Sequence, residues 1–464
     1  MNSPDAASAT PAEHARTATR APDPPGPEGA FHFGSLAEIR DNPMDFYVRI
    51  SQKYGGIVRF FYGKKATYLV SEPDLIKELL IKHRERYVKN ERYKELQRLI
   101  GEGLLLSEGE VWQRQRTSSM PAFRRERIHA QLPVIAQLVD ERLDKWQAMV
   151  DSGEPFDTEP HFSEISQSLI CDFILGTENR DLTEPILEVL RRLMTYWPTP
   201  PRTILGGYKL PSPKTVRELK GALADLDDCF YEAIRRARAS NQEDGALGVL
   251  LQHEHESQGR YEDQELRDQL VTLYMAGFET SASVATWLFY RLSLQPQIRD
   301  RVYAEVASVL DGSPPDAETL PLLDLTKRSI QETMRLYPPA YNFSRIAVQD
   351  DVLGGYHIPK GAMVIVAPWA THRLTAYWPD PEGFDPDRFL PERNAKRPGM
   401  AYIPFGAGHR VCIGAGLATV QLTVTVARFC QRYRLDLEPA HHVRHVPGTV
   451  MRPENGMVMR VLSI

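Results

Sequence analysis

Apolar positions recur with the spacing of amphipathic helices over most of the chain before residue 337. The longest of these patterns, residues 263–295, is apolar nearly all round at its centre, which predicts a helix through the middle of the protein. Residues 55–71 instead alternate aromatic and β-branched side chains around a Gly-Lys-Lys turn, which predicts a β-hairpin. Short strand and turn patterns return after Pro338. We therefore expect a mainly α-helical fold with a smaller β region, formed from approximately residues 31–72 and 338–400.

Two segments carry no regular pattern. Residues 1–30 are rich in Ala, Thr and Pro and poor in large apolar side chains, so we expect them to form a disordered tail. Residues 196–215 contain five prolines and two glycines, and we expect them to be a loop between helices that acts as a lid. Residues 31–464 are expected to form a single domain.

Composition and charge argue against several classes of function. The chain is 42% hydrophobic with a formal net charge of -5, so its overall charge does not favour nucleic-acid binding. Its four cysteines are scattered without a CxxC pair, which argues against a disulfide framework and against a structural zinc site. No apolar run approaches the ~18 residues of a membrane span, and the N-terminus lacks an apolar signal core. We therefore expect a cytoplasmic protein without a membrane anchor.

One cysteine stands in an unusual setting. The segment FGAGHRVCIGAG, residues 405–416, places Cys412 among four glycines, directly before a long apolar helical pattern. The glycines predict a tight loop whose backbone closely approaches another group. The start of a helix favours the thiolate form of a cysteine, because the helix N-terminus carries partial positive charge. Such a thiolate is either a nucleophile or a metal ligand.

Three separated motifs decide between these alternatives. The first is F-x-x-G-x-R-x-C-x-G, formed by Phe405, Gly408, Arg410, Cys412 and Gly414. The second is Glu-x-x-Arg, formed by Glu332 and Arg335, and the third is AGFETS, residues 276–281, at the centre of the long helix. In this order and spacing the motifs resemble the cytochrome P-450 family of heme-thiolate monooxygenases, over nearly all of the chain from about residue 31. The resemblance implies that family's fold, with the long central helix over a buried heme b.

By this resemblance, Cys412 is the axial ligand of the heme iron. A thiolate in this position pushes electron density into the iron and favours cleavage of the O–O bond of dioxygen. Backbone N–H groups of the glycine loop would hydrogen-bond the sulfur, and Gly414 would let the start of the helix lie close to the porphyrin. The other heme contacts implied are Phe405, Gly406, Ala276 and Gly277.

The two propionates of a heme require cations in a fixed geometry, a role that suits arginine. The resemblance assigns this role to Arg410, Trp112, Arg116 and Arg345. Trp112 and Arg116 belong to a WxxxR pattern that, taken alone, also fits an ordinary amphipathic helix face. Only the other motifs favour the heme-binding interpretation of these two residues.

A second group of charged residues resembles the structural ion-pair cluster that the family carries beneath its heme-binding loop. Its members are Glu332, Arg335 and Arg388. A Glu and an Arg one turn apart contribute only about 0.2–0.5 kcal/mol on an isolated helix. We therefore expect this cluster to serve folding and not chemistry.

Thr280 and Glu279, within the AGFETS motif, are expected to handle protons. A threonine hydroxyl that bonds the carbonyl three or four residues earlier, beside Gly277, loosens the helix and opens a groove for dioxygen and water. Activation of dioxygen needs protons, so a hydroxyl that holds water and an acid that connects to bulk solvent suit the site. The alternative is that Thr280 packs in the core and that Glu279 points to solvent.

The positions that the resemblance places around a substrate are mainly apolar, which suits a terpenoid, polyketide or fatty acyl compound. They are Leu104, Leu105, Leu106, Tyr196, Trp197, Met275, Ala276, Ala340, Phe343 and Met451. The implied reaction is insertion of one oxygen atom from dioxygen. The alternatives are a peroxide-driven heme peroxygenase and a non-catalytic heme-binding sensor or carrier, and the Glu279–Thr280 pair argues against both.

Electrons are expected to come from separate partner proteins. Because the chain ends soon after Cys412, no reductase domain is expected, and a ferredoxin or flavodoxin with its reductase would supply electrons ultimately from NAD(P)H. The partner would dock on a basic patch around the Trp112 helix, which in the family borders the proximal side of the heme. The patch consists of Arg114, Arg124, Arg125 and Arg127. The protein itself is expected to be a monomer.

Overall fold

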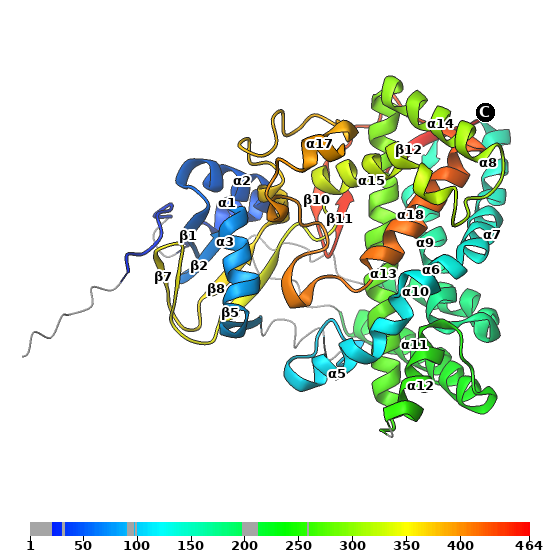
Figure 1. The fold of residues 1–464 in the computed structure, drawn as a ribbon, viewed down its shortest axis with the longest axis horizontal. Coiled ribbons are helices and arrows are strands. Elements are labelled where there is room, and N and C mark those ends of the chain that lie inside the picture. The colour runs from blue at the N-terminus through cyan, green and yellow to red at the C-terminus, as the bar shows by residue number, and fades with distance from the viewer. Residues whose placement is uncertain (1–20, 30–32, 91–96, 98–99, 197–211, 258) are drawn as a thin grey trace, which may run out of the picture.

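The computed structural model describes residues 21–29, 33–90, 97, 100–196, 212–257 and 259–464. It consists of a large helical body with a smaller β region on one side (Figure 1). The expected tail lies mostly outside the described residues. Near its end, the Arg59 N–H donates to the Pro25 carbonyl (2.9 Å) and the His357 N–H donates to the Pro22 carbonyl (2.9 Å). Contacts with the folded domain thus begin before the boundary expected at residue 30.

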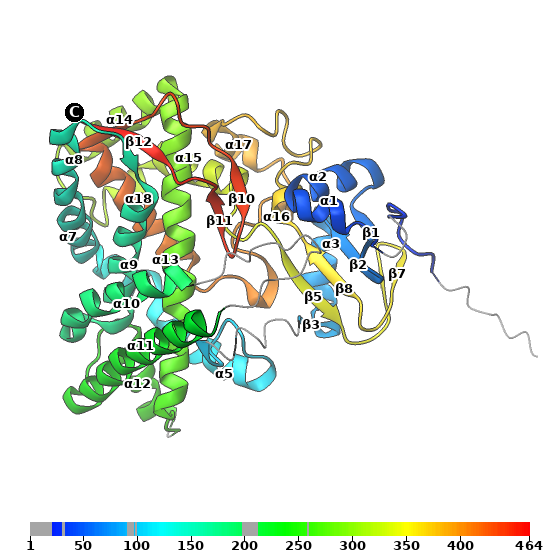
Figure 2. The ribbon, with the colours of Figure 1, turned by 180° about the vertical axis from the view of Figure 1, so that it is seen from behind.

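The helical body is built around α13 (Asp263–Leu294), which runs through the molecule in both ribbon views (Figure 1 and Figure 2). This helix matches the long apolar pattern, and residues 266–274 and 281–289 are buried all round. Helix α9 (Glu159–Leu175) packs along it. The other helices of the body are α5 (Gly109–Ser119), α6 (Arg125–Ala130), α7 (Leu132–Leu143), α8 (Gln147–Ser152), α10 (Thr183–Tyr196), α11 (Pro213–Ser240), α12 (Gly245–Ser257), α14 (Pro296–Leu310), α15 (Asp324–Leu336) and α18 (Ala415–Cys430).

Shorter helices accompany the β region, and local sequence explains where helices begin. These shorter helices are α1 (Leu36–Asp41), α2 (Pro43–Tyr54), α3 (Pro73–Lys77), α16 (Pro368–Thr371) and α17 (Pro391–Asn394). The Asn42 side chain caps α2 by accepting from two N–H groups of its first turn, at 3.1 and 3.2 Å. Pro43 then takes the first helical position, where a missing N–H costs nothing. In the same way, Pro133 lies in the first turn of α7.

The β region contains a five-stranded sheet with the order β1-β2-β8-β5-β3. Its strands are β1 (Ile57–Tyr62), β2 (Lys65–Val70), β3 (Tyr87–Lys89), β5 (Phe343–Ala347) and β8 (Met363–Val366). β1 and β2 form the predicted hairpin, and β8 joins β2 in parallel, so segments far apart in sequence share one sheet. The pairing of β3 with β5 places Lys89 opposite Arg345. The expected mainly α-helical fold with a discontinuous β region is confirmed.

Smaller sheets lie elsewhere in the molecule. A three-stranded sheet has the order β4-β12-β9. Two further sheets have two strands each, β6 with β7 and β10 with β11. These strands are β4 (Phe156–Asp157), β6 (Asp351–Leu353), β7 (Tyr356–Ile358), β9 (Tyr433–Leu437), β10 (His445–Pro447), β11 (Met451–Pro453) and β12 (Val458–Ser463). The β10-β11 hairpin is fixed to α13, because the Met451 carbonyl accepts a hydrogen bond from Ser283 Oγ at 2.8 Å.

The main hydrophobic core lies where α13 meets α7, α9 and α18. The rings of Phe162 and Phe289 stack there with centroids 5.2 Å apart, and Phe429 of α18 lies 4.4 Å from Phe289. Burial of one such side chain stabilises the fold by about 1.5–3 kcal/mol. The core therefore fixes α18 relative to the middle of α13. It also fixes the segment before α18, residues 405–414, which we call the cysteine loop. No described helix is long and apolar enough to cross a membrane.

Candidate active site

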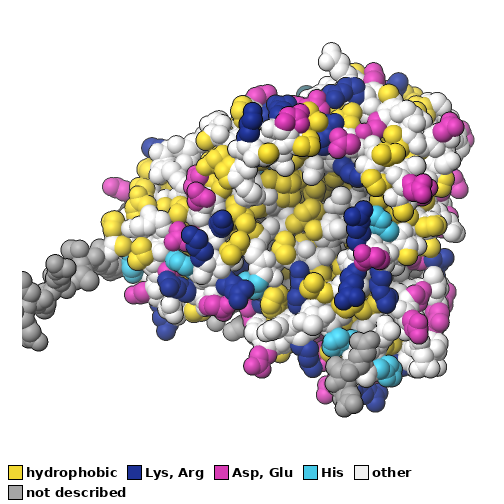
Figure 3. Space-filling view, viewed as in Figure 1, with side chains coloured by type: hydrophobic (Ala, Val, Ile, Leu, Met, Phe, Trp, Pro, Cys, Tyr) yellow, Lys and Arg dark blue, Asp and Glu magenta, His cyan; other side chains and the backbone are white. Residues whose placement is uncertain are grey.

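A hollow opens beside α13 in the middle of the face shown in Figure 3, lined by hydrophobic side chains and with Lys and Arg side chains around it. The middle of α13 is accessible although the helix is buried on either side. Ala276 is exposed and Met275 and Gly277 are half-buried, whereas Tyr274 and Phe278 are buried. The AGFETS motif therefore marks a turn in the middle of α13 that opens toward accessible space, as a substrate pocket requires.

Thr280 lies on the same face of α13 as Ala276, one turn later. Its Oγ1 donates to the Ala276 carbonyl at 2.9 Å, and its side chain is half-buried. A hydroxyl that bonds the carbonyl four residues earlier competes with the helix's own hydrogen bond at that point. The hydrogen bond that the sequence predicted at Thr280 is present, but α13 stays a regular α-helix through residues 276–281, so the expected loosening of the helix is not seen.

The loop before Cys412 is shaped by glycines in left-handed backbone conformations. Gly406 has a φ of +70° and Gly408 a φ of +73°. A Cβ at Gly408 would lie 2.4 Å from the Leu80 carbonyl oxygen, so only glycine fits there, whereas a Cβ at Gly406 would meet no atom within 4 Å. The Cys412 N–H donates to the Phe405 carbonyl at 3.0 Å and closes the loop. The loop then leads into α18, which begins three residues after the cysteine.

The Cys412 side chain is solvent-accessible but lies among protein atoms. Burial raises the pKa of its thiol, while a hydrogen bond from the Gly414 backbone and the charge of Arg116 oppose that rise. The net shift of the Cys412 pKa is upward, opposite to the thiolate-favouring effect that the sequence predicted from the start of the helix. A Cβ at Gly414 would make only ordinary contacts, 3.9 Å from Cys412 Sγ and 3.8 Å from the Phe123 ring. The protein by itself does not require glycine at residue 414.

Arg410 is held in place by groups from the start of α5. Its Nη1 donates to the Ser107 carbonyl at 3.0 Å, and its Nη2 donates to Glu108 Oε2 at 2.6 Å. Its guanidinium lies 4.0 Å from the centre of the Trp112 ring, which also packs edge-on against His409 at 5.4 Å. Trp112 and Arg410, which lie far apart in sequence, are thus in direct contact.

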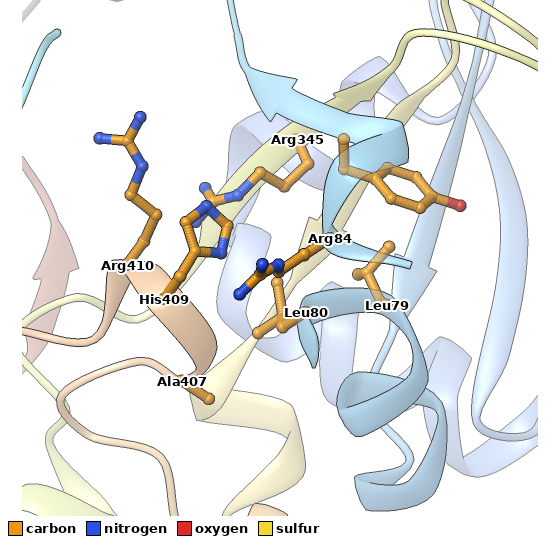
Figure 4. Close-up of a pocket in the computed structure, with 8 residues that line it drawn as sticks. Leu79, Leu80, Arg84, Arg345, Ala407, His409 and Arg410 are labelled. Carbon is orange, nitrogen blue, oxygen red and sulfur yellow. The ribbon is translucent and has the colours of Figure 1, made fainter. Parts of the chain in front are cut away.

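The other two predicted propionate partners, Arg116 and Arg345, come from α5 and β5. Arg116 Nη1 donates to the Val411 carbonyl at 2.9 Å, directly beside the cysteine. Arg345 is buried on β5, and Figure 4 shows it with Arg84 and His409 around a small cavity. That cavity is lined by Leu79, Leu80, Arg84, Tyr87, Arg345, Ala407, His409 and Arg410. Burial lowers the pKa of Arg410 to about 10, and the charges of Arg345 and Arg116 add to this effect.

Lys89 belongs to the same cluster, although the sequence analysis missed it. Its Nζ donates to the Leu105 carbonyl, and its backbone N–H donates to Glu108 Oε1 at 3.0 Å. Burial, with the charges of Arg410 and Arg345 acting in the same direction, lowers the pKa of Lys89 to about 7. Only the pairing of β3 with β5 brings Lys89 to this place, and that pairing leaves no signal in the sequence.

This donor set fits the group that the family resemblance implies. Lys89, Arg116, Arg345 and Arg410 concentrate positive charge beside an apolar hollow and a cysteine, and their charges act on one another's pKa. Such a site suits a flat apolar ligand that carries carboxylates at one edge and accepts a sulfur ligand at a metal. Heme has this chemistry, so the residues present fit a heme.

The Glu-x-x-Arg motif forms a buried ion-pair network. Arg335 Nε and Nη2 donate to Glu332 Oε2 and Oε1 at 2.7 and 2.8 Å, and Arg388 Nε donates to Glu332 Oε1 at 3.2 Å. All three side chains are buried. The remaining guanidinium N–H groups of Arg335 donate to backbone carbonyls of residues 372–383. The network thus joins α15 to the segment that leads toward the cysteine loop.

His372 is a second residue that the sequence analysis missed. Its Nε2 accepts a hydrogen bond from the Ile403 N–H at 2.9 Å, so its Nδ1 carries the proton that bonds the Arg335 carbonyl at 3.1 Å. Burial, together with the charge of Arg335, lowers the pKa of His372 to about 3. An imidazole that stays neutral at neutral pH therefore links the helix of the Glu-x-x-Arg motif to residue 403, two positions before Phe405. A lone histidine in sequence carries no signal for such a role.

The alternative interpretation, in which Glu279 points to bulk solvent, is wrong. Arg452 Nη2 donates to Glu279 Oε1, and only 11% of the glutamate side chain is exposed. Burial raises the pKa of Glu279, and Arg452 opposes that rise. The carboxyl is thus held by β11, while the neighbouring Thr280 bonds within α13. The two residues expected to handle protons, Glu279 and Thr280, are neighbours in sequence, but their side chains have different partners.

The expected substrate contacts differ in how accessible they are. Ala340 and Leu105 are exposed and Met275 and Phe343 are half-buried. Leu104 and Leu106 are buried, and Met451 has no exposed surface because its side chain belongs to the main core. Met451 therefore does not line the hollow, contrary to the prediction from the sequence. Trp197 and the side chain of Tyr196 lie outside the described residues, as does most of the expected lid. The end of that expected loop is wrong, because residues 213–215 form the first turn of α11.

The basic patch is smaller than the sequence analysis expected. Arg124, Arg125 and Arg127 are exposed at the start of α6. Arg114 instead donates to Glu265 of α13 and lies 5.4 Å from the centre of the Tyr261 ring. We call Arg124, Arg125 and Arg127 the α6 patch. Helix α6 packs against the first turn of α18, which directly follows the cysteine loop. Ile128 Cδ1 of α6 lies 3.7 Å from the place that a Cβ on Gly416 of α18 would take.

Comparison with known proteins agrees with this geometry. Residues 24–460 match the family model described as Cytochrome P-450. Pentalenene oxygenase of Streptomyces avermitilis is 29% identical over 433 residues, which cover 90% of this chain and 93% of that protein. Cyclooctat-9-en-7-ol 5-monooxygenase of Streptomyces melanosporofaciens is 32% identical over 428 residues, which cover 90% of this chain and 89% of that protein.

The same fold occurs among solved structures. The heme domain of cytochrome P450DA superposes on this chain with a TM-score of 0.82 at 24% sequence identity. The superposition covers 96% of this chain and 97% of that domain. At this level of identity the likeness shows the fold, and it confirms the fold class expected from the sequence.

Proposed function

The chain belongs to the cytochrome P-450 family, a family of heme enzymes that use dioxygen, and we propose that it inserts one oxygen atom from dioxygen into an apolar terpenoid. The observation that carries this proposal is the accessible turn of α13 at Ala276 and Thr280, which borders an apolar hollow in a fold that also presents Cys412. The two bacterial relatives, whose names identify them as terpenoid oxygenases, support the choice of substrate class.

Cys412 would hold the heme iron, and when bound the heme supplies the redox chemistry that activates dioxygen. The cysteine loop fixes the sulfur through the Phe405 carbonyl and offers it the Gly414 backbone as a hydrogen-bond donor. Such bonds tune the donor strength of a ligating sulfur. Trp112, Arg116, Arg345 and Arg410 would bind the propionates, and Lys89 would be a fifth partner.

Protons and water would be handled on α13. Thr280 presents its hydroxyl beside the Ala276 carbonyl, where an ordered water could bond both groups. Glu279 has a raised pKa, which suits a group that takes up and releases protons. An apolar substrate that fills the hollow would keep other water out, so that protons would be delivered through these groups.

Electrons would come from an acidic protein that docks on the α6 patch. The patch adjoins the first turn of α18, so a partner bound there would lie close to Cys412. Complementary charge raises the rate of such encounters and sets their orientation. A ferredoxin or flavodoxin with its NAD(P)H-dependent reductase is the class of partner that fits.

A product assay tests the proposed function. Purified holoprotein would be incubated with pentalenene, ferredoxin, its reductase and NADPH, and the products analysed by mass spectrometry under isotopically labelled dioxygen. We expect a product that carries one labelled oxygen atom and that is absent with Cys412→Ser. If hydrogen peroxide alone drives the reaction as fast, the peroxygenase alternative is favoured. If the compound binds but is never oxidised, the sensor or carrier alternative is favoured.

A further inference from the structure

Glu279 has little direct access to solvent, yet a proton donor must be recharged from solvent after each turnover. The residue that holds it, Arg452 of β11, also lies 3.6 Å from Glu159, measured from Nε to Oε1. One guanidinium therefore bridges two carboxylates that come from different helices, α9 and α13. Glu159 is the more exposed of the two, with 24% of its side chain accessible against 11% for Glu279.

The backbone next to Arg452 is fixed to the same face of α13. The Met451 carbonyl accepts hydrogen bonds from Ser283 Oγ at 2.8 Å and from Trp287 Nε1 at 3.5 Å. Ser283 lies one helical turn after Glu279, so both residues face β11. Because the backbone beside it is held, the Arg452 guanidinium is kept within reach of both Glu279 and Glu159.

Glu159 lies among charged groups that set its protonation. It begins α9, and its N–H donates to Asp157 Oδ1 at 3.1 Å. Burial raises the pKa of Glu159 to about 7, with the charges of Asp157 and Glu279 adding to the rise and that of Arg452 opposing it. Glu159 is thus present in both protonation states near neutral pH, and its titration is coupled to that of Glu279.

We propose that Glu159 is the outer acid of a proton relay in which Arg452 connects it to Glu279. The inference rests on the proposed monooxygenase function, which requires a supply of protons. The O–H bond of protonated Glu159 breaks, and the proton moves through an intervening water to the Glu279 carboxylate, where a new O–H bond forms. Negative charge is thereby transferred to Glu159, and Arg452, which stays charged, turns toward it. Solvent then protonates Glu159 again.

Glu159 and Arg452 act through Glu279, so they are positioning residues and touch no reacting atom. Their coupling can be measured without turnover, by carbon NMR of holoenzyme labelled at the glutamate carboxyl groups. The signal missing from Glu159→Gln identifies Glu159. We expect it to titrate near pH 7 in the wild type and at lower pH in Glu279→Gln, because a neighbouring negative charge has been removed. A midpoint near the ordinary ~4.3 that is unmoved by Glu279→Gln would overturn the proposal.

A second experiment measures proton delivery. Dioxygen consumption would be followed with ferredoxin, its reductase and pentalenene as the probe, in water and in deuterium oxide. We expect Glu159→Gln to slow dioxygen consumption by roughly tenfold, which is less than the ~10²–10⁴ that a direct proton donor contributes to the rate. The solvent isotope effect should rise. Glu159→Asp, which keeps the acid, should restore part of the rate.

The matched control is Glu438→Gln. Glu438 is similarly exposed, at 27%, and lies 3.5 Å from Arg460, but it has no contact with Glu279 among the ion pairs of the described residues. The Glu438→Gln substitution should leave the rate of dioxygen consumption and the solvent isotope effect unchanged. If Thr280→Ala disturbs turnover while Glu159→Gln matches the wild type, the relay is wrong and the monooxygenase function stands. If the wild type consumes no dioxygen, the proposed function fails, and the carboxyl titration alone decides whether Glu159 and Glu279 are coupled.

Discussion

Arg335 binds both carboxylate oxygens of Glu332, with Nε to Oε2 at 2.7 Å and Nη2 to Oε1 at 2.8 Å, and neither side chain has any exposed surface. A buried ion pair is tolerated only when its remaining hydrogen-bonding groups are satisfied. Here they are, because Arg335 also donates to three backbone carbonyls, which belong to His372, Pro381 and Gly383. The pair therefore fastens α15 to the chain that leads to the cysteine loop.

Loss of Arg335 should destabilise the fold far more than loss of a surface arginine. Arg335→Leu leaves Glu332 with Arg388 and the Asp385 N–H as partners and leaves three carbonyls without the arginine donor, so we expect the free energy of unfolding to fall by about 3–5 kcal/mol. Arg301→Leu, which removes a half-exposed arginine paired with Asp387, should cost at most about 1 kcal/mol. Urea unfolding measures both values, and equal losses would contradict the assigned role.

His372 should make stability depend on pH in a predictable direction. Its folded-state pKa of about 3 lies below the ~6.5 of the unfolded chain. The stability due to the neutral imidazole is therefore complete above about pH 6.5 and falls by about 1.4 kcal/mol per pH unit as the pH decreases toward 3. We expect His372→Gln to show a shallower loss of unfolding free energy between about pH 6.5 and pH 4.5. Parallel curves for the two proteins would contradict this account.

The two left-handed glycines of the cysteine loop should differ in their tolerance of alanine. Gly406→Ala pays only for a left-handed backbone, about 1–2 kcal/mol, since the new Cβ meets no neighbour. Gly408→Ala adds a contact of 2.4 Å with the Leu80 carbonyl oxygen and must displace the loop. We expect a larger loss of unfolding free energy and a larger loss of bound heme for Gly408→Ala. Equal effects would show that the Leu80 contact does not shape the loop.

Thr280→Ala should separate dioxygen consumption from product formation. We expect the fraction of dioxygen that appears in product to fall by roughly ten- to a hundredfold, with hydrogen peroxide released instead, because the hydroxyl that holds water is lost. Thr286→Ala is the matched control, since Thr286 makes the same 2.9 Å bond to the carbonyl four residues earlier but is buried. Unchanged coupling in Thr280→Ala would remove Thr280 from the proposed proton path.

Charge reversal in the α6 patch should slow electron transfer from a ferredoxin. For Arg124→Glu with Arg125→Glu we expect a rate about tenfold lower at low ionic strength, with a smaller difference at high salt. The affinity for pentalenene, measured from the heme spectrum, should not change. Arg217→Glu, at an exposed position on α11, is the control. Identical stopped-flow kinetics in the patch variant and the control would exclude this docking site.

The parts of the molecule that could be predicted from the sequence depend on local signals. The length and all-round apolarity of residues 263–295 predicted α13 to within one residue. Alternation around a glycine turn predicted the β1-β2 hairpin, and the spacing of glycines around Cys412 predicted a tight loop. Each of these features is encoded within a few neighbouring residues, where period and backbone preference decide the outcome.

The parts that could not be predicted depend on which distant segments meet. Lys89 joins the cationic cluster only through the pairing of β3 with β5, and Glu279 meets Arg452 only because β11 crosses α13. Met451 was expected to line the hollow, but its hairpin turns it into the core. A resemblance in motifs locates residues along the chain, whereas the choice between core and cavity is made by packing.

The central claim is that Cys412 holds a heme iron as a thiolate. It is tested most directly by the visible spectrum of purified, dithionite-reduced protein with and without carbon monoxide, recorded for the wild type and for Cys412→Ser. We expect a strongly red-shifted Soret band in the carbon monoxide complex of the wild type and its loss in the variant. Absence of heme, or a spectrum like that of a histidine-ligated globin, would contradict the claim and with it each role assigned around Cys412.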